Sequence, residues 1–456
     1  MFFGTAYLPE NLNLETILNN NPPPFKYRID KFQRIGSLLT EIPANNKELL
    51  SDSGFVPINA QILQSSIHDY SRYLTYFIEN TIMETDNQYI KGQKSKCFRF
   101  TDQFQTPITP VVIDNKRYIQ TLNTLSKYEI RMIKKYYYLF KWFNDDLNID
   151  FPKANEYIWQ QLKNNRALHI ENALLKFNSY FLNIDRFNKK NFYFIVDTSV
   201  SRLHTNIVVM KSELRNFISY GGKNLVSIDM SNSQPYLSTV LLNETFWKKE
   251  IFAGNLNIYS ALRKPHLLKQ VLSEKSINNI LSYIMLVRSA ESIDNSGFEQ
   301  YIHEAANGTL YQYINRQFEI ISGHKIRDKK KLKEIIFRVL YTDNRFIGQR
   351  EAEPKRIFRA IFPEVYELFK LLKKTDSTLL PRLLQTIESK MMLDVIAKRI
   401  AKEKPNMPLF TVHDSIVCPV GNENYCAKVI KEEMKKAIGI EPSLKFEYWS
   451  PENLKN

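Results

Sequence analysis

The sequence predicts an α+β protein in which a small sheet is assembled from segments that lie far apart in the chain. Apolar, β-branched stretches of strand length occur at residues 192–196, 225–228 and 409–417, and residues 444–448 also read as a strand. A largely helical insertion, roughly residues 236–402, separates the second run from the third. A mostly helical pattern also covers about residues 62–187. Helices therefore surround a sheet whose strands come from both sides of a long insertion.

The N-terminal region contains two long apolar-periodic segments, residues 126–144 and 155–182, which predict helices. Residues 93–119 are β-branched and contain proline, and they predict a small hairpin. The run Asn19–Pro24 cannot lie inside a helix and predicts an extended arm. Residues 91–99 form the most basic loop of the region, which is either a solvated charge run or a nucleic-acid contact.

Composition indicates a globular protein with a polyanionic partner. The chain has 456 residues, enough for two or three subdomains, with 43% hydrophobic and 24% charged residues. Its net charge is +15, and 13% of its residues are aromatic. A Lys-rich coding bias explains such an excess, and so does a nucleic acid, whose phosphates attract cations and whose bases stack on rings.

The cysteines and the hydropathy pattern concern the compartment. Cys97, Cys418 and Cys426 are the only cysteines, and no pair has metal-ligand spacing. We therefore expect a reduced, intracellular and cytoplasmic protein. No apolar run reaches the roughly 18 residues that a membrane span needs, and the first residues do not resemble a secretory signal.

Two aspartates stand out because each interrupts an apolar strand. Asp229 follows Leu225–Ile228, and Asp414 lies within Leu409–Val417, on the far side of the helical insertion. A carboxylate in such a place is costly to bury without a cation. If the sheet brings them together, they form a candidate divalent-metal site, and two carboxylate-bound metals are the usual machinery of phosphoryl and nucleotidyl transfer.

Each aspartate also has a simpler explanation. Asp229 is a possible N-cap for a helix over residues 236–242, which Pro235 is suited to begin. Asp414 is a possible ordinary polar residue at the tip of a tight hairpin. His413-Asp414 also matches the dyad of HD-type phosphohydrolases, but those dyads lie on helices and this one has strand-like neighbours.

A basic and aromatic helix lies between the two aspartates. Lys329, Lys333, Phe337 and Tyr341 recur every four residues and therefore share one helix face over about 18 Å. Ammonium groups neutralise phosphates and rings stack on bases, so this face is suited to a nucleoside triphosphate. The alternative is a solvated basic helix whose apolar residues face the core.

Together, these three segments resemble motifs A, B and C of the family A DNA polymerases and the related single-subunit, phage-type RNA polymerases, in the same order. The resemblance covers about residues 190–450. Further segments that resemble family elements are Ser201–Thr205, Leu214–Phe217, Phe337–Tyr341, Phe358–Pro363 and Gln385–Ser389.

The resemblance implies a right-hand polymerase fold, with an antiparallel palm sheet, helical fingers and a mostly helical N-terminal region. The implied divisions are an N-terminal thumb-like or template- and primer-handling region, a first palm segment with motif A, fingers with motif B, and a second palm segment with motif C. Their bounds are 1–190, 191–243, 244–380 and 381–456. The N-terminal region shows no Asp-x-Glu exonuclease signature in a strand context.

The resemblance also implies catalytic and nucleotide-binding roles. Asp229 and Asp414, helped by the backbone carbonyl of Met230, would bind two Mg²⁺ ions, for which Mn²⁺ can substitute. Lys333 would contact the triphosphate and assist the leaving pyrophosphate, and Lys329 would take the place of the family's arginine. The remaining implied contacts are Phe337 with the incoming sugar, Tyr341 with the template base, and Arg202, Gln385 and His413 with the primer–template end.

Three positions depart from the DNA polymerase pattern. Gln234 replaces the glutamate that shields the sugar 2′ position, Ser415 replaces the second acid of motif C, and Thr342 replaces a glycine. The choice between deoxynucleotides and ribonucleotides therefore stays open. The bulk of Gln234, which is able to hydrogen-bond to Tyr341, favours deoxynucleotides.

The predicted activity is DNA-directed DNA synthesis without a proofreading exonuclease, on a primer–template and with nucleoside triphosphates. An RNA polymerase or primase on the same core is one alternative, and a catalytically idle nucleic-acid-binding replication or defence factor is another. We expect a monomer without membrane attachment. The sequence leaves the template, the priming mode and any processivity partner open.

Overall fold

A computed structural model describes residues 4–46, 54–90, 94–170, 172–248, 256–261, 272–290, 297–344 and 347–454. Helices and strands are mixed, and every pairing between strands of this described part is antiparallel. The α+β class that the sequence predicted is therefore confirmed. No described helix is long and apolar enough to cross a membrane.

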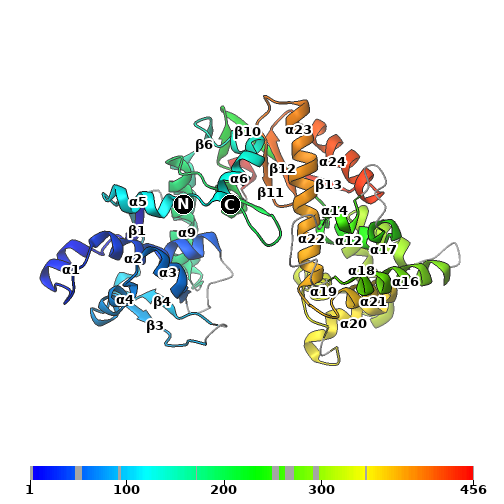
Figure 1. The fold of residues 1–456 in the computed structure, drawn as a ribbon, viewed down its shortest axis with the longest axis horizontal. Coiled ribbons are helices and arrows are strands. Elements are labelled where there is room, and N and C mark those ends of the chain that lie inside the picture. Colours follow the sequence, from blue (N-terminus) through cyan, green and yellow to red (C-terminus); the bar gives the residue numbers. More distant parts are fainter. Residues whose placement is uncertain are drawn as a thin grey trace.

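The central sheet joins strands from distant parts of the chain (Figure 1). Strand β10 (Lys223–Met230) pairs with β12 (Ser415–Pro419) on one side and with β13 (Leu444–Tyr448) on the other. Strand β11 (Phe410–Val412) lies beyond β12, while β9 (Ile218–Tyr220) and then β6 (Leu147–Ile149) extend the other end. The predicted strands around residues 225, 409 and 444 are thus confirmed as neighbours.

The fourth predicted strand forms a separate two-stranded sheet. Phe194–Val196 (β7) pairs with Leu203–Thr205 (β8) and does not join the central sheet. The loop between β7 and β8 carries Arg202, one of the predicted site residues.

Strand β10 is apolar at successive positions because it is covered on both faces. Val226 and Ile228 belong to one hydrophobic core, which extends into the helical insertion, and Leu225 belongs to a second core. A strand covered on both faces has apolar residues at consecutive positions, without the alternation of a half-exposed strand. Asp229 is therefore set into one of the best-buried strands of the protein.

The insertion after β10 is helical, as predicted. Its first half contains α12 (Ser233–Ser238), a 3₁₀ turn (Thr239–Leu242), α13 (Glu244–Trp247), α14 (Ile258–Ala261), α16 (Glu274–Ala290), α17 (Gly297–Ala306) and α18 (Leu310–Ser322). Its second half contains α19 (Lys329–Tyr341), a 3₁₀ turn (Arg350–Ala352), α20 (Glu353–Ile361), α21 (Pro363–Leu372) and α22 (Leu379–Ser389).

A long helical column connects the insertion to the sheet. Helix α22 continues through a π-helical segment (Lys390–Ala397) into α23 (Lys398–Glu403). In Figure 1 this column stands between the central sheet and the helices around α16, α20 and α21. After β12, α24 (Glu423–Ile438) packs against β10 and β12 and is followed by β13 and a 3₁₀ turn (Pro451–Asn453).

The N-terminal region has helices and its own small sheets. Its helices are α1 (Leu14–Asn20), α2 (Ile29–Asn45), α3 (Ala60–Ser66), α4 (Tyr70–Glu79), α5 (Lys116–Asn123), α6 (Lys127–Lys135), α7 (Tyr137–Phe140), α8 (Phe151–Ala167) and α9 (Ala173–Asn188). Its other elements are β1 (Thr5–Pro9), β2 (Val56–Pro57), β3 (Met83–Thr85), β4 (Cys97–Phe100), β5 (Ile108–Val112) and a 3₁₀ turn (Asp102–Phe104).

Some local predictions in this region were wrong. Strands β4 and β5 exist but form no hairpin, because β4 pairs with β2 and β3 while β5 pairs with β1. The chain does not open as an extended arm: β1 is buried beside β5, and the prolines lie in the link between α1 and α2. Residues 91–93 of the basic loop lie outside the described residues.

The two long helical segments are each divided in two. Residues 126–144 contain α6 and α7, with Tyr136 between them, and residues 155–182 contain portions of α8 and α9. Apolar periodicity does not mark these breaks, because the helices on either side of each break carry apolar residues that reach the hydrophobic cores.

A buried ionic cluster connects α2 to α9. The Glu41 carboxylate lies 2.8 Å from Arg34 and 3.2 Å from Arg186, and it accepts a hydrogen bond from Ser37 at 2.6 Å. Burial raises the pKa of Glu41, but the two guanidinium groups and the hydroxyl more than offset this and lower the pKa to about 2. The folded state therefore stabilises the ionised carboxylate.

We predict that the free energy of unfolding contributed by this cluster depends on pH. A carboxyl whose pKa is lower in the folded chain stabilises the fold above its unfolded pKa, and the contribution disappears as the pH falls through the folded pKa. Near neutral pH, the free energy of unfolding of the wild-type protein should exceed that of the Glu41→Gln variant by about 3 kcal/mol. Denaturant titrations should show this difference shrinking from about pH 4.5 towards pH 2; a constant difference would contradict the assignment.

Candidate active site

The central sheet brings the two aspartates together. Asp229, the penultimate residue of β10, lies opposite Ser415, the first residue of β12. The Ser415 hydroxyl donates a hydrogen bond of 2.7 Å to Asp229 Oδ1. Asp414 directly precedes Ser415 in the turn that joins β11 to β12. Two carboxylates from opposite sides of the helical insertion thus share the end of the sheet.

Asp229 is not the cap of the following helix. The chain remains in the strand through Met230, and the N-cap of α12 is Asn232, in the left-handed conformation with φ of 53°. Asparagine adopts this conformation more readily than most residues. The N-cap explanation for Asp229 was therefore wrong, and the carboxylate is available for another role.

Asp414 lies at the tip of a tight hairpin, as predicted. Val412 pairs with Ser415, so His413 and Asp414 form a two-residue turn in which His413 has φ of 52°. Burial raises the pKa of Asp414, and the negative charges of Asp229 and Glu388 raise it further, while Ser233 opposes them. The strand context also excludes the helical dyad of HD-type phosphohydrolases.

Glu388 belongs to this site although the sequence analysis did not assign it a role. It lies on α22 with a side chain only 2% exposed. One carboxylate oxygen accepts from Arg202 Nε at 3.0 Å and Arg202 Nη2 at 2.7 Å, and the other accepts from the side-chain amide of Gln234. Burial raises the pKa of Glu388, with Arg202 and Gln234 acting in the opposite direction.

The loop before β8 holds Arg202 in place. The Asp197 carboxylate accepts hydrogen bonds from the backbone amides of Ser199 and Val200 at 2.8 Å and from that of Arg202 at 2.7 Å. Burial raises the pKa of Asp197, but these bonds and His204 together lower it well below its usual range. The predicted nucleic-acid contact Arg202 is therefore preorganised and paired with Glu388.

The predicted basic and aromatic stripe exists on α19. Lys329, Lys333 and Phe337 are exposed, while Ile336 and Leu340 face the core. Neither ammonium group has an ion-pair partner among the described residues. The rings of Phe337 and Tyr341 stack with centroids 5.2 Å apart. The arrangement fits both a ligand-binding face and a solvated basic helix.

Tyr341, at the end of this stripe, interacts electrostatically with Glu388 and Asp414. Burial raises the pKa of Tyr341 to about 12, and the charges of Glu388 and Asp414 contribute in the same direction while Arg202 opposes them. The Tyr341 hydroxyl thus lies in the electrostatic field of the site. The suggested hydrogen bond between Gln234 and Tyr341 is not formed between these two described residues, since Gln234 donates to Glu388.

Lys373 anchors the C-terminal end of α19. Its ammonium group donates to the backbone carbonyls of Val339 and Thr342, the latter at 2.9 Å. Burial, followed by the nearby charge of Lys355, lowers the pKa of Lys373 to about 7. The lysine satisfies carbonyl groups that the end of a helix leaves without partners. It therefore fixes the segment next to Tyr341.

Two further predicted residues lie around the site. Gln385 is half-buried on α22, one turn before Glu388. Desolvation of the His413 ring lowers its pKa to about 4, and Arg202, His204 and Arg215 act in the same direction. Several positive groups therefore lie near the hairpin tip.

The carboxylates of Asp229 and Asp414 fit a divalent cation whose remaining ligands come from substrate phosphates and water. Within the described part of the chain, no group of three or more His, Cys, Asp or Glu side chains is arranged to hold a metal ion. Mg²⁺ is commonly bound by one or two carboxylates together with substrate phosphates and water. Asp229 and Asp414 provide such a pair, and their repulsion, which raises the pKa of Asp414, is what a cation would relieve.

Several neighbouring polar atoms lack partners. Ser231 Oγ, Asn232 Nδ2 and Gln234 Oε1 are buried and form no hydrogen bond with any described residue. Such atoms in a native protein call for an explanation, which is often a functional one. Here they lie in the turn directly after Asp229.

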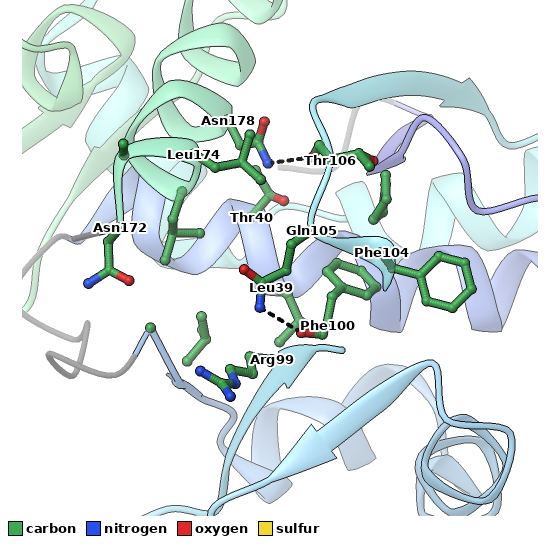
Figure 2. A pocket seen from close by; sticks show the side chains of 15 residues that line it. Leu39, Thr40, Arg99, Phe100, Phe104, Gln105, Thr106, Asn172, Leu174 and Asn178 are labelled. Carbon is green, nitrogen blue, oxygen red and sulfur yellow. Dashed lines mark hydrogen bonds between the residues drawn. The ribbon is translucent and has the colours of Figure 1, made fainter. Parts of the chain in front are cut away.

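A cavity elsewhere in the protein lacks comparable chemistry. It has a volume of about 220 Å³ and lies in the N-terminal region between α2, β4, residues 104–106 and α9 (Figure 2). Asn178 donates to the Thr106 carbonyl at 3.2 Å across its rim. Its charged residue, Arg99, forms an ion pair of 2.5 Å with Glu84. The cavity contains neither of the aspartates.

Comparisons with known proteins do not assign a family. No protein-family model and no curated protein matches the chain. Among the similar solved structures is the POL domain of Pol1 from M. smegmatis in complex with DNA primer-template and dNTP. The sequence identity is 10%, the match covers 74% of this chain and 72% of that one, and the TM-score is 0.30. A score this low does not establish a common fold.

We predict that the turn after Asp229 depends on Gly308. Gly308 has φ of +75°, and a Cβ atom there would lie 2.9 Å from Ser231 Cβ. Gly323 has nearly the same backbone, φ +72°, with no atom within 4 Å of such a Cβ. Gly323→Ala should cost about 1 kcal/mol of unfolding free energy, and Gly308→Ala about 1–3 kcal/mol more because of overpacking. Equal losses in denaturant titrations would show that the contact with Ser231 is unimportant.

Proposed function

We propose that the protein is a template-directed nucleotidyltransferase, a DNA polymerase that adds deoxynucleotides to the 3′-hydroxyl of a primer. The observation that carries this proposal is the pairing of β10 with β12, which brings Asp229 beside Asp414. Tyr341, at the end of a basic and aromatic helix face, lies in the same electrostatic environment. A carboxylate pair next to a triphosphate-binding face is the combination that nucleotidyl transfer needs.

The metal component of the proposal is Mg²⁺, for which Mn²⁺ is a substitute. Asp229 and Asp414 would hold two ions, with the carbonyl of Met230 as a further ligand. When bound, such ions neutralise charge on the phosphates and lower the pKa of the attacking hydroxyl. The chain's own contribution is to present two carboxylates whose positions are fixed by the strand and the hairpin.

The nucleotide would bind along α19. Lys329 and Lys333 would contact the triphosphate, Phe337 would pack beside the sugar, and Tyr341 would lie against the template base. In the reaction, the primer 3′-hydroxyl releases its proton to solvent water, and its oxygen forms a bond to the α-phosphorus while the bond from that phosphorus to the bridging oxygen breaks. The leaving pyrophosphate takes up the negative charge, and Lys333 would neutralise this charge or protonate the leaving oxygen.

The primer–template end would lie against Arg202, Gln385 and His413. The Asp197 turn and Glu388 preorganise the guanidinium of Arg202, so contact with nucleic acid would require little reordering of this side chain. In this proposal, residues 191–243 and 381–456 form a palm, residues 244–380 form fingers, and residues 1–190 handle the primer or template. The net charge of +15 suits such a partner.

A second candidate is an RNA polymerase or primase on the same core. Two observations favour it. Ser415 follows Asp414 where the DNA polymerases that the motif resembles have a second acid, and phage-type RNA polymerases lack that acid too. The buried Gln234 Oε1 also has no partner among the described residues. A hydrogen-bond acceptor in the site would suit an additional sugar hydroxyl. A nucleic-acid-binding protein without catalysis is the remaining alternative.

We predict that both aspartates are required for primer extension. The intact protein should extend a primed DNA template with dNTPs and Mg²⁺, and Asp229→Asn or Asp414→Asn should reduce the rate by about 10³-fold or more, corresponding to at least about 4 kcal/mol in the barrier. A gel-based extension assay measures this. Asp185→Asn is the matched control, since Asp185 is a buried carboxylate that accepts from Tyr7 at 2.8 Å in the N-terminal region.

The same assay separates the candidate functions. Extension with rNTPs in preference to dNTPs, or synthesis on an unprimed template, would establish the RNA polymerase or primase. Undiminished extension by either aspartate variant would contradict the catalytic assignment. Failure of the intact protein on every template, with nucleic-acid binding retained, would establish the non-catalytic alternative.

We also predict that Lys333 binds the triphosphate. Lys333→Met removes one ammonium group from the exposed face of α19 and should raise the KM for the nucleotide about tenfold or lower kcat, since a charge-assisted contact is worth about 1.5–3 kcal/mol. Lys428→Met is the control, because Lys428 is an exposed lysine on α24 with a side chain 73% exposed. Steady-state extension kinetics check this. Equal KM and kcat values for the two variants would contradict a role of Lys333 in triphosphate binding.

A further inference from the structure

The Glu388 carboxylate determines the orientation of an amide in the candidate site. An ionised carboxylate offers only hydrogen-bond acceptors. Its Oε1 is paired with the guanidinium of Arg202 and its Oε2 accepts from Gln234. Gln234 must therefore turn its NH₂ group towards Glu388, because a carbonyl oxygen in that position would face another acceptor. Gln234 Oε1 is consequently the atom that points elsewhere.

Gln234 Oε1 is a hydrogen-bond acceptor that no protein donor satisfies in the described structure. It is buried and has no hydrogen-bond partner among the residues that the structure describes. A buried polar group left without a partner destabilises the site, and a ligand that supplies the partner recovers the lost hydrogen bond. Gln234 lies shortly after Asp229, at the start of α12, and Glu388 is close enough to Asp414 to raise its pKa.

The neighbouring side chains do not satisfy this acceptor. Arg202 directs its Nε and Nη2 to Glu388, and Ser415 donates to Asp229. The Tyr341 hydroxyl senses the charges of Glu388 and Asp414, but it forms no hydrogen bond with Gln234 in the described structure. A donor from a bound ligand is therefore the partner that would complete the site.

We propose that Glu388 is a positioning residue that holds the Gln234 amide so that its carbonyl oxygen accepts a hydrogen bond from a sugar hydroxyl of the bound nucleotide. This rests on the proposed function, which places a nucleoside triphosphate beside Asp229 and Asp414. The 2′-hydroxyl and the 3′-hydroxyl share the required chemistry. A site built around such a contact discriminates against the nucleotide that lacks the hydroxyl.

Equilibrium binding of ATP, dATP and ddATP tests the proposal without requiring turnover. These nucleotides differ only in the 2′- and 3′-hydroxyl groups. Calorimetric titration in Mg²⁺ should show wild-type affinity falling by about three- to tenfold when the contacted hydroxyl is removed. A step, meaning a drop in affinity, between ATP and dATP identifies the 2′-hydroxyl as the contacted group. A step between dATP and ddATP identifies the 3′-hydroxyl.

Three variants separate positioning from general stability. Gln234→Met keeps the length of the side chain but removes the acceptor, so the step should disappear. Glu388→Gln allows the amide to face either way, so the step should shrink. The double variant Gln234→Glu with Glu388→Gln should restore it, because position 388 then donates and position 234 keeps an acceptor. Such a rescue would not occur if Glu388 only stabilised the fold.

Glu41→Gln is the matched control, since Glu41 is another buried carboxylate paired with arginine; it lies on α2 and pairs with Arg34 of the same helix and Arg186 of α9. It should leave the affinity ratios unchanged, and thermal unfolding of all variants checks that each is folded. Should Glu388→Gln not fold, Gln234→Met alone decides the outcome.

Equal affinity of the wild type for all three nucleotides, or no binding, would overturn the proposal. The proposal would also be overturned if Gln234→Met kept the same ratio of nucleotide affinities as the wild type. These results are distinct from failure of the proposed function. If the protein extends primers but binds ATP, dATP and ddATP equally, only the hydroxyl contact is contradicted. If it discriminates between these nucleotides but extends no primer, the polymerase activity is contradicted and the nucleotide site is supported.

Discussion

The register between β10 and β12 is the constraint on which the rest of the site depends. It places Asp229 opposite Ser415, and therefore beside Asp414, although the whole helical insertion separates the two aspartates in the sequence. A shift of one residue in a strand pairing turns every side chain to the other face of the sheet. Here such a shift would move Val226 and Ile228 out of the larger core, so apolar packing fixes the position of the carboxylate.

The burial that fixes the aspartates also makes their charges costly. Desolvation raises the pKa of Asp414, and Asp229 and Glu388 raise it further. Of these carboxylates, Glu388 is the one that forms an ion pair with Arg202. A site with an excess of negative charge in a partly buried position is stabilised when a cation binds. Electrostatics therefore support the proposed metal role independently of the resemblance.

Particular residues show what the sequence predicted and what it did not. The strand carrying Asp229 was predicted, because apolar β-branched runs have few alternatives, and the hairpin with Asp414 at its tip followed from the flanking strands. The face of α19 followed from a four-residue repeat. Positions that depend on local periodicity were therefore accessible from the sequence.

Glu388 and Lys373 were missed because their roles depend on partners far away in the chain. Glu388 bonds to Arg202, which lies on the other side of the helical insertion, and Lys373 caps α19, which ends at Tyr341. The available signal for Glu388 was weak, because Arg382, Lys390 and Asp394 also interrupt the apolar residues of 379–397. The pairing of β4 and β5 with different strands was also inaccessible, because short strands carry no mark of their partners.

The most direct test of the account is to locate a bound divalent cation. Crystals grown with Mn²⁺ and a nucleoside triphosphate should give an anomalous signal between the carboxylates of Asp229 and Asp414, with the phosphates directed towards Lys333. Loss of that signal in Asp229→Asn would support the assignment. A Mn²⁺ signal elsewhere in the protein, with both aspartates bonded only to protein groups, would contradict it.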